Sequence, residues 1–380
     1  MTGSRADYGL LRWVIQGISD SEVLELQLVV TGMHLSPEFG LTVNEILADG
    51  FAISKRVESV LSSDSPVGTA KSIGLGVIGF ADALSELAPD ILVLLGDRYE
   101  IWSAAIAALP LGIPVAHIHG GERTEGAIDE SIRHSLTKLS TVHFVATEEY
   151  RTRVAQLGEN PARIFLVGGL GVDALDRIPL LDKATLEAEL GLTFGSRSLL
   201  VTFHPVTHEY RSAAQQLQEL LAALSSMRET TIIFTAPNAD AEGRALKAMV
   251  EAFVAGNDNA HVFDSMGQHL YLSTLQFVDA VVGNSSSGLL EAPSFKKPTI
   301  NIGDRQDGRL KATSVIDCDP TQESIARAIA LGLGPEFQAS LVEVINPYGI
   351  PGASEKVVAV LENIDLERQT RKAFFDLDPL

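Results

Sequence analysis

Short apolar runs alternate with helical stretches along almost the whole of this 380-residue chain. The runs have the length and composition of buried strands, and the stretches between them have the length of helices. The expected strands are residues 24–30, 91–95, 115–118, 142–146, 164–167, 198–203, 230–234, 261–263, 280–283 and 298–302. The expected helices include residues 68–87, 99–109, 130–139 and 355–375. This alternation predicts an α/β fold of parallel sheets covered by helices on both faces.

The length of the chain predicts two domains, because 380 residues exceed what one hydrophobic core usually organises. Gly168-Gly169-Leu170-Gly171 interrupts the alternation and is interpreted as a hinge. We therefore expect one doubly wound domain over residues 1–170 and a second over residues 171–360, with a cleft between them. No apolar run precedes the helix expected at residues 10–18, so the first strand of the first domain is apparently missing.

Composition restricts the partners and the compartment. A formal net charge of −20 argues against nucleic acid or an anionic membrane, because phosphate groups would be repelled. Cys318 is the single cysteine, which excludes an internal disulfide and a cysteine-based metal cluster. The apolar stretch 101–118 is interrupted by Pro110, Gly112 and Pro114, so it is interpreted as helix, turn and strand rather than a membrane span. Without a secretory signal pattern, the expected location is the cytoplasm.

A group of titratable residues follows two expected strands of the first domain. Gly96-Asp97-Arg98-Tyr99-Glu100 and His117-Ile118-His119-Gly120-Gly121-Glu122 lie at these strand ends, and Ile128-Asp129-Glu130-Ser131-Ile132-Arg133-His134 comes next. Ligands bind at the carboxyl ends of parallel strands, so acids, bases and an arginine collected there indicate a reaction site. The alternatives are a solvated turn for Asp97 and an exposed helix face for Arg133 and His134, and the second is favoured when these two residues are taken alone.

The second domain contains its own polar group. Ser285 and Ser286 lie in a small loop between an apolar strand and a helix start, where hydroxyl and backbone N–H groups bind diphosphates well. Glu291 follows and is placed to accept hydrogen bonds from ribose hydroxyls. The alternative is an ordinary helix N-cap. Arg305, in Gly303-Asp304-Arg305-Gln306, adds a cation at the same sheet edge and favours a nucleotide site, although no P-loop motif is present.

Two further residues follow strands of the second domain. His204 comes directly after residues 198–203, and Asn238 follows residues 230–234 closely. A lone histidine is more often structural than catalytic, and His34, His143 and His261 are interpreted in that way. His204 differs because its position after a strand directs it towards the predicted site.

Together these motifs resemble the UDP-N-acetylglucosamine 2-epimerase family, and within it the hydrolysing branch that supplies sialic-acid-type nonulosonate synthesis. The matching pieces include Thr2-Gly3-Ser4-Arg5-Ala6-Asp7-Tyr8, His204-Pro205 and Asn284-Ser285-Ser286-Ser287-Gly288, besides those quoted above, and they occur in family order. The resemblance implies a GT-B type architecture, with two Rossmann-like domains, a UDP-sugar in the interdomain cleft, and a C-terminal helix at residues 361–380 packing back on the first domain. It also implies a homodimer or homotetramer, with no cofactor and no metal.

The resemblance also assigns roles residue by residue. It implies that Asp97 and Asp129 are catalytic. The UDP-binding positions that it implies are Arg5, Arg98, Asn238, Ser285, Ser286, Glu291 and Arg305. His204 would complete the pocket and is counted among the catalytic candidates. One position departs from the family, since His119 stands where some members have a glutamate. Either Glu122 takes over that carboxylate's role or His119 acts as the base.

The implied reaction explains the need for such residues. Removal of the C2 proton of an N-acetylhexosamine requires a well-placed base while UDP leaves from C1, and cations stabilise the departing diphosphate. A 2-acetamidoglycal forms and is then hydrated with inversion at C2. UDP-GlcNAc, giving N-acetylmannosamine, is the first choice of substrate, and UDP-2,4-diacetamido-2,4,6-trideoxyglucose of legionaminic acid synthesis is the alternative. A GT-B glycosyltransferase and a non-catalytic nucleotide-sugar sensor are alternatives of other classes.

Overall fold

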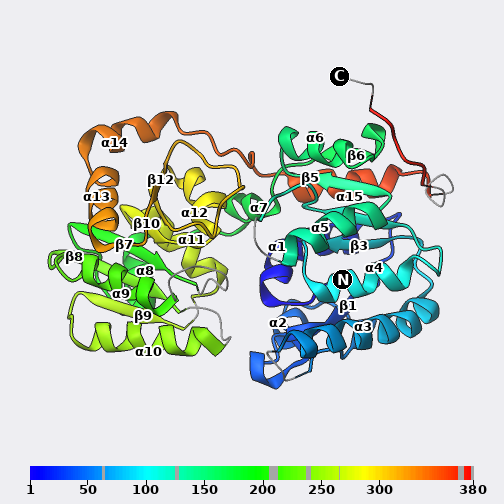
Figure 1. Cartoon of the computed structure of the whole chain (residues 1–380), viewed down its shortest axis with the longest axis horizontal. Coiled ribbons are helices and arrows are strands. Elements are labelled where there is room, and N and C mark those ends of the chain that lie inside the picture. Colours follow the sequence, from blue (N-terminus) through cyan, green and yellow to red (C-terminus); the bar gives the residue numbers. More distant parts are fainter. Residues whose placement is uncertain are drawn as a thin grey trace. The chain divides into compact units, whose positions relative to one another are not determined.

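The computed structural model describes residues 1–61, 65–124, 128–204, 213–236, 241–264, 266–366 and 372–377. They form two compact units, unit 1 (Met1–Asp173 and Tyr348–Leu380) and unit 2 (Ala174–Pro347). In each unit parallel strands alternate with helices, which confirms the predicted α/β class (Figure 1). The chain returns to unit 1 at Tyr348, earlier than the boundary at residue 361 that the sequence predicted.

Unit 1 contains a four-stranded parallel sheet in the order β3-β4-β5-β6 and a separate parallel pair, β1-β2. The strands are β1 (Val29–Thr31), β2 (Lys55–Val57), β3 (Leu92–Leu95), β4 (Val115–Ile118), β5 (Val142–Val145) and β6 (Ile164–Leu166). The helices are α1 (Arg5–Asp20), α2 (Val43–Ala48), α3 (Pro66–Leu87), α4 (Tyr99–Ala108), α5 (Ile128–Leu139), α6 (Glu148–Gln156) and α15 (Ala353–Asn363), with the 3-10 turns η1 (Gly32–Leu35), η2 (Pro37–Phe39) and η3 (Pro161–Arg163). Helix α7 (Leu170–Arg177) leads into unit 2.

The N-terminal residues occupy the position where the sequence lacked a strand. Thr2 forms an isolated parallel bridge with Val30 of β1, and the Met1 amino group donates to the carbonyl of Val93 in β3 at 3.3 Å. Two residues are too few for a full strand, so the β1 and β3 ladders are joined only at this point. The strand predicted at residues 24–30 begins only at Val29. A strand needs a neighbour to form a ladder, and the neighbouring strand β2 begins opposite Val29, at Lys55.

Unit 2 contains a six-stranded parallel sheet in the order β12-β11-β10-β7-β8-β9. The strands are β7 (Arg197–Thr202), β8 (Thr230–Thr235), β9 (Ala260–Phe263), β10 (Ala280–Gly283), β11 (Thr299–Ile302) and β12 (Val315–Cys318). The helices are α8 (Lys183–Leu190), α9 (Ala213–Leu224), α10 (Ala241–Ala255), α11 (Gly267–Phe277), α12 (Ser287–Leu290), α13 (Gln322–Gly332) and α14 (Pro335–Ser340), with η4 (Ala292–Phe295) and η5 (Leu341–Glu343). The strand order reverses between β7 and β10, and such a reversal is where ligands bind in doubly wound sheets.

The central strands of both sheets are fully buried, and helices pack against their apolar side chains. In unit 2, Leu199, Ile232 and Ile300 have no exposed surface and belong to one core cluster with α9 and α13. The sequence missed the strands β2 and β12. Both are short and only partly buried, so neither has the continuous apolar run by which the other strands were predicted.

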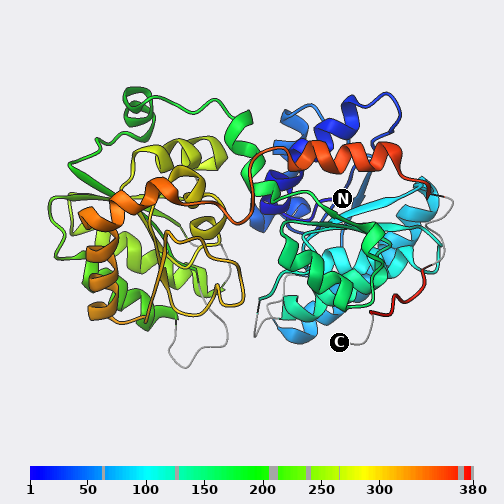
Figure 2. The ribbon, with the colours of Figure 1, turned by 90° about the horizontal axis from the view of Figure 1, so that it is seen from above.

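The C-terminal helix packs on α1 within unit 1, as Figure 2 shows. A Cβ at Gly17 of α1 would lie 2.8 Å from Val358 of α15, so glycine allows the close approach. The buried carboxylate of Asp173 accepts hydrogen bonds from the backbone N–H groups of residues 352–354 at 2.6–2.8 Å and anchors the start of α15. The helix predicted at residues 355–375 ends earlier, at Asn363, and residues 372–377 form no helix.

Candidate active site

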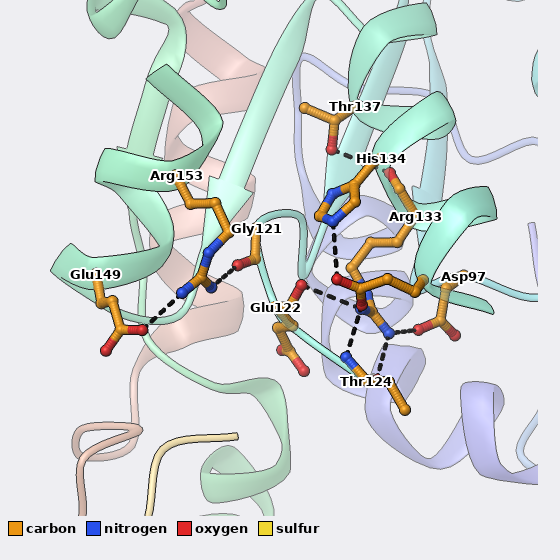
Figure 3. A network of polar contacts seen from close by, with 10 residues as sticks. Asp97, Gly121, Glu122, Thr124, Arg133, His134, Thr137, Glu149 and Arg153 are labelled. Atoms are coloured by element: carbon orange, nitrogen blue, oxygen red, sulfur yellow. Dashed lines mark hydrogen bonds and ion pairs between the residues drawn. The ribbon is translucent and has the colours of Figure 1, made fainter. Parts of the chain in front are cut away.

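The site in unit 1 is organised around Arg133 of α5, which has only 1% of its surface exposed (Figure 3). Its guanidinium donates to the backbone carbonyl of Glu122 at 3.0 Å, to Glu130 at 2.8 Å and to the hydroxyl of Thr124 at 2.8 Å, and it forms an ion pair with Asp97. A buried guanidinium is tolerated only where charge and hydrogen bonds compensate its loss of water. Arg133 therefore ties the ends of β3 and β4 to the first turn of α5.

Two acidic residues, Asp129 and Glu130, lie in the first turn of α5. Glu130 accepts from the Thr124 backbone N–H at 2.6 Å and from His134 Nε2 at 2.9 Å, so its orientation is fixed. Asp129 is half-buried, and burial, with the negative charge of Asp97 added, raises its pKa. A carboxyl group with a raised pKa beside another carboxylate is suited to acid–base chemistry.

Arg98 follows β3 and begins α4. Its guanidinium forms an ion pair at 2.9 Å with Glu100, which is 1% exposed. Burial raises the pKa of Asp7 in α1 to about 6, against the opposing positive charge of Arg98. The charges of Arg98 and Glu100 both act on the pKa of Asp7, because the first turn of α1 lies next to the end of β3. Sequence reasoning named Asp7 only as part of a motif, because nothing in the spacing links it to Glu100.

The loop after β4 is held by His119, Gly121 and Arg153. A Cβ at Gly121, whose φ is 81°, would lie 2.5 Å from the backbone oxygen of Tyr150, so this position requires glycine. Arg153 of α6 donates to the Gly121 carbonyl and forms an ion pair with Glu149 at 2.7 Å (Figure 3). The loop is therefore fixed from the α6 side.

His119 uses both of its ring nitrogens. The Leu170 backbone N–H donates to Nε2 at 3.3 Å, so Nε2 is an acceptor, and Nδ1 lies 2.9 Å from Glu122 Oε1. In the neutral ring the proton is then on Nδ1, the nitrogen that lies near the carboxylate of Glu122. His117, two residues earlier, donates from Nε2 to the Gly96 carbonyl at 2.7 Å, and burial lowers its pKa to about 3. Both histidines thus orient neighbouring groups.

The second site lies at the strand reversal of unit 2. A Cβ at Gly283, whose φ is 136°, would lie 1.9 Å from the carbonyl oxygen of Thr202, so glycine lets the ends of β7 and β10 approach. The buried side chain of Asn284 accepts from the His204 backbone N–H at 2.7 Å and donates to the His204 carbonyl at 2.9 Å. Burial lowers the pKa of His204 to about 4, with the charge of Arg305 adding to the effect. Asn284 therefore fixes the backbone of a neutral histidine.

The serine loop differs from the predicted helix start. Helix α12 has only four residues, and its N-cap residue Ser286 makes no capping hydrogen bond, but the Ser285 hydroxyl accepts from the Ser287 backbone N–H at 3.4 Å, as the N-cap alternative expects. Glu291 comes directly after α12, and burial raises its pKa to about 7. Arg305 donates to the Asn284 carbonyl at 3.0 Å, next to the loop that contains Ser285 and Ser286. Hydroxyl groups, a cation and a buried carboxyl group are thus gathered at one sheet edge, as the sequence predicted.

The structure brings most of the predicted residues into these two groups. Arg5 is exposed at the first position of α1. Asn238 lies outside the described residues. Arg133 was not among the residues assigned a role, and an exposed helix face was favoured for it only when it was taken alone; the signal that marks it is the acidic pair three and four residues earlier. Within the described ranges, no three His, Cys, Asp or Glu side chains are arranged to hold a metal ion.

Comparison with known proteins places this geometry in a family. The family model described as UDP-N-acetylglucosamine 2-epimerase matches residues 16–362. The chain belongs to this family. Membership makes it a nucleotide-sugar epimerase, and the resemblance stated from its motifs is confirmed.

Two curated relatives of this epimerase match nearly its whole length. It is 38% identical to the GDP/UDP-N,N'-diacetylbacillosamine 2-epimerase (hydrolyzing) of Campylobacter jejuni, with 99% of this chain and 98% of that protein covered. It is also 38% identical to the polysialic acid biosynthesis protein P7 of Escherichia coli, with 99% and 96% covered. The solved structure of a putative UDP-N-acetylglucosamine 2-epimerase from Listeria monocytogenes matches with a TM-score of 0.82 at 18% identity, covering 99% of this chain and 98% of that one. This likeness confirms the GT-B type fold.

Proposed function

We propose that this epimerase acts by hydrolysis, converting a UDP-N-acetylhexosamine and water into UDP and the free 2-epimeric sugar. The observation that supports this most strongly is the group of carboxylates around buried Arg133, in a chain 38% identical over 379 residues to a hydrolysing 2-epimerase. In the first step a base removes the C2 proton, its electron pair forms the C1=C2 bond, and the bond from C1 to the UDP oxygen breaks. In the second step water adds its oxygen at C1 and a proton is returned to C2 from the opposite face.

The residues of unit 1 are assigned to proton transfer. Asp97, Asp129 and Glu122 supply the base and the acid that the two steps require. Arg133 orients Asp97 and the backbone of Glu122, so it is a positioning residue. Burial raises the pKa of Asp129, which supports its assignment as a group that exchanges a proton with the sugar.

The sequence left open whether Glu122 or His119 takes the role of the glutamate that some family members have at position 119. The contacts of the two side chains favour Glu122. Both ring nitrogens of His119 contact protein groups, and a second proton on Nε2 would break the bond from the Leu170 N–H. A base needs a free lone pair, whereas a carboxylate retains further acceptor sites after one contact. We therefore assign the proton transfer to Glu122 and an orienting role to His119.

The residues of unit 2 are assigned to the UDP moiety. Ser285, Ser286 and Arg305 are proposed to bind the diphosphate, and Glu291 the ribose hydroxyls. His204, Asn238, Arg5 and Arg98 complete the set of proposed substrate-binding groups. Arg305 supplies a positive charge next to the serine loop, and such a charge stabilises the departing UDP.

The relatives change the order of the two candidate substrates. N,N'-diacetylbacillosamine is the 2,4-diacetamido-2,4,6-trideoxyglucose that sequence reasoning placed second, and a hydrolysing 2-epimerase named for it is 38% identical to this chain. We place its UDP derivative first. UDP-GlcNAc stays the second candidate, supported by the equal identity to a protein named for polysialic acid biosynthesis. Family membership disfavours the transferase and sensor alternatives, and the composition supports a cytoplasmic location.

A reaction in D2O tests both the mechanism and the substrate. The purified protein is incubated separately with each UDP-sugar, and the sugar is followed by NMR. Release of UDP together with a 2-epimer deuterated at C2 is expected, with the larger kcat/KM for the diacetamido-trideoxy sugar. A larger kcat/KM for UDP-GlcNAc would reverse the substrate order, product without deuterium at C2 would exclude the elimination, and no turnover of either would contradict the proposed function.

A further inference from the structure

Strand β6 lies at a free edge of the four-stranded sheet of unit 1. It is last in the order β3-β4-β5-β6, and in the part of the chain that the structure describes no strand pairs with its other side. The parallel register sets Leu166 opposite Val145, and the Val167 backbone N–H donates to the Val145 carbonyl at 3.0 Å. The N–H and C=O groups of Leu166 therefore point away from β5. Such an edge is a template on which another extended segment can pair.

A groove runs along this edge, between β6 and α15. Two hollows of about 400 and 440 Å³ form it, and both are lined by Phe165 of β6 and by Ala359 and Val360 of α15. Figure 1 shows β6 next to α6 and α15 within unit 1. Phe165 and Val360 are only half-buried, and Leu166 exposes 46% of its surface. The floor of the groove is therefore apolar and open to a ligand.

Cations also line the groove. They are Arg151 of α6, Arg163 next to β6 and Lys356 of α15, and Asp365 is the acid among the lining residues. The contact of Arg151 with Glu148, at 3.3 Å, is an exposed ion pair and therefore a weak one. The whole chain has 49 acidic and 29 basic residues, so this local excess of positive charge departs from its general character. The excess favours an acidic ligand.

The edge and the groove together restrict what can bind. Successive side chains of an extended segment point to opposite faces, so a segment paired with β6 presents every second side chain to the apolar floor. Acidic residues between these apolar ones complement the cations. A second copy of this chain would bring the same cations to the same edge, and like charges disfavour such self-pairing.

We propose that the edge of β6 binds an extended segment of a partner protein in which apolar and acidic residues alternate. The segment adds a strand to the sheet by pairing with the backbone of Leu166, and its apolar side chains fill the groove between β6 and α15. None of the residues assigned to proton transfer or to UDP lines this groove, so the proposal does not depend on the reaction.

Fluorescence anisotropy with a defined peptide tests the groove. The probe is a short fluorescein-labelled peptide in which valine and glutamate alternate, and it is titrated with the full chain. Saturable binding is expected, and Leu166→Glu and Arg151→Glu are each expected to raise the dissociation constant more than tenfold. Lys183→Glu is the matched control, because Lys183 is an exposed lysine on α8 of unit 2. No saturable binding, or binding that both variants leave unchanged, would overturn the proposal.

Hydrogen exchange distinguishes strand pairing from charge attraction alone. Exchange of the Leu166 backbone N–H is expected to slow at least tenfold when the peptide is bound, because this group then donates to the added strand. Unchanged exchange at Leu166 in the complex would exclude the added strand. Equal binding of a peptide in which valine and lysine alternate would exclude the charge complementarity. A dimer of the wild type that Leu166→Glu dissociates would overturn the proposal in favour of a second copy.

Discussion

At the scale of single residues, the environment of Arg133 decides what its neighbours do. Its guanidinium is surrounded by oxygen atoms of Asp97, Glu122, Thr124 and Glu130, which come from three separate segments of the chain. Removing one partner of a buried charge leaves the other uncompensated, so the group behaves as a unit. Predictions about its members therefore use replacements that keep the shape of the side chain.

Asp97→Asn tests the proposed base. Asparagine can still accept a hydrogen bond from Arg133, but it cannot take a proton from C2. We expect kcat to fall at least a thousandfold while the dissociation constant of UDP, measured by calorimetry, changes less than threefold. Asp49→Asn is the control, because Asp49 also forms an ion pair with an arginine, Arg12 at 2.8 Å, outside the site. Equal loss of activity and of UDP binding would assign Asp97 to binding or folding.

His119 and Glu122 are distinguished by a pair of variants. His119→Asn keeps a polar side chain near Glu122 and tolerates the positive φ of 66° at this position. We expect it to retain activity within about tenfold, whereas Glu122→Gln should lose more than a hundredfold in kcat. Steady-state kinetics with matched circular dichroism spectra make the comparison. The opposite order of the two losses would make His119 the base.

At the scale of elements, α5 links the site to the C-terminal segment. Lys372 donates to the carbonyl oxygens of Thr137, Lys138 and Ser140 at 3.0, 2.7 and 2.6 Å, and so satisfies the otherwise open C-terminal end of α5. It also forms an ion pair at 2.7 Å with Glu159, which is buried. The opposite end of α5 contains Asp129, one of the proposed acid–base groups.

Lys372→Met is therefore expected to loosen α5. We expect hydrogen exchange of the last turn of α5 to accelerate at least tenfold and kcat to fall several-fold with KM little changed, because the proposed acid–base groups lose their fixed position. Lys55→Met is the control, since Lys55 forms only a surface ion pair with Glu86. Unchanged exchange in α5 would show that Lys372 does not hold this helix.

At the scale of the whole molecule, two buried glutamates make stability depend on pH in opposite directions. Lys138, Lys372 and His143 hold the pKa of Glu159 down to about 2 against the effect of burial, whereas burial raises the pKa of Glu291 to about 7. The contribution of Glu159 is present above its ordinary pKa of about 4.5 and is lost as the pH falls towards 2. That of protonated Glu291 is complete below about 4.5 and is lost as the pH rises through 7.

Thermal unfolding across pH checks both signs. Glu159→Gln is expected to be less stable than the wild type at pH 7, with the difference shrinking between pH 5 and pH 3. Glu291→Gln is expected to match the wild type near pH 4 and to exceed its melting temperature at pH 8. Each unit of pKa difference corresponds to about 1.4 kcal/mol at most. A melting temperature of Glu291→Gln that falls below the wild type at pH 8 would contradict the assigned direction.

Local pattern alone was enough to predict much of the fold. The alternation of apolar runs and helices predicted the parallel α/β class and nearly all of the buried strands, since buried strands need continuous apolar side chains. Asp97 and His204 each lie two residues after a strand, at the sheet edges where the sequence predicted them. The shortness of helix α12 and the early end of α15 were not predicted.

The sequence by itself determined the class of fold and the family, because periodicity and motif spacing are local properties of the chain. Only the tertiary structure decided that Arg133 is buried, that His119 is occupied at both nitrogens and that Asn284 fixes His204. Each of these depends on partners from distant segments, such as Leu170 for His119, and no spacing along the chain specifies such a contact. Burial sets the pKa values of Asp129 and Glu291 for the same reason: water is excluded by the packed fold, not by adjacent residues.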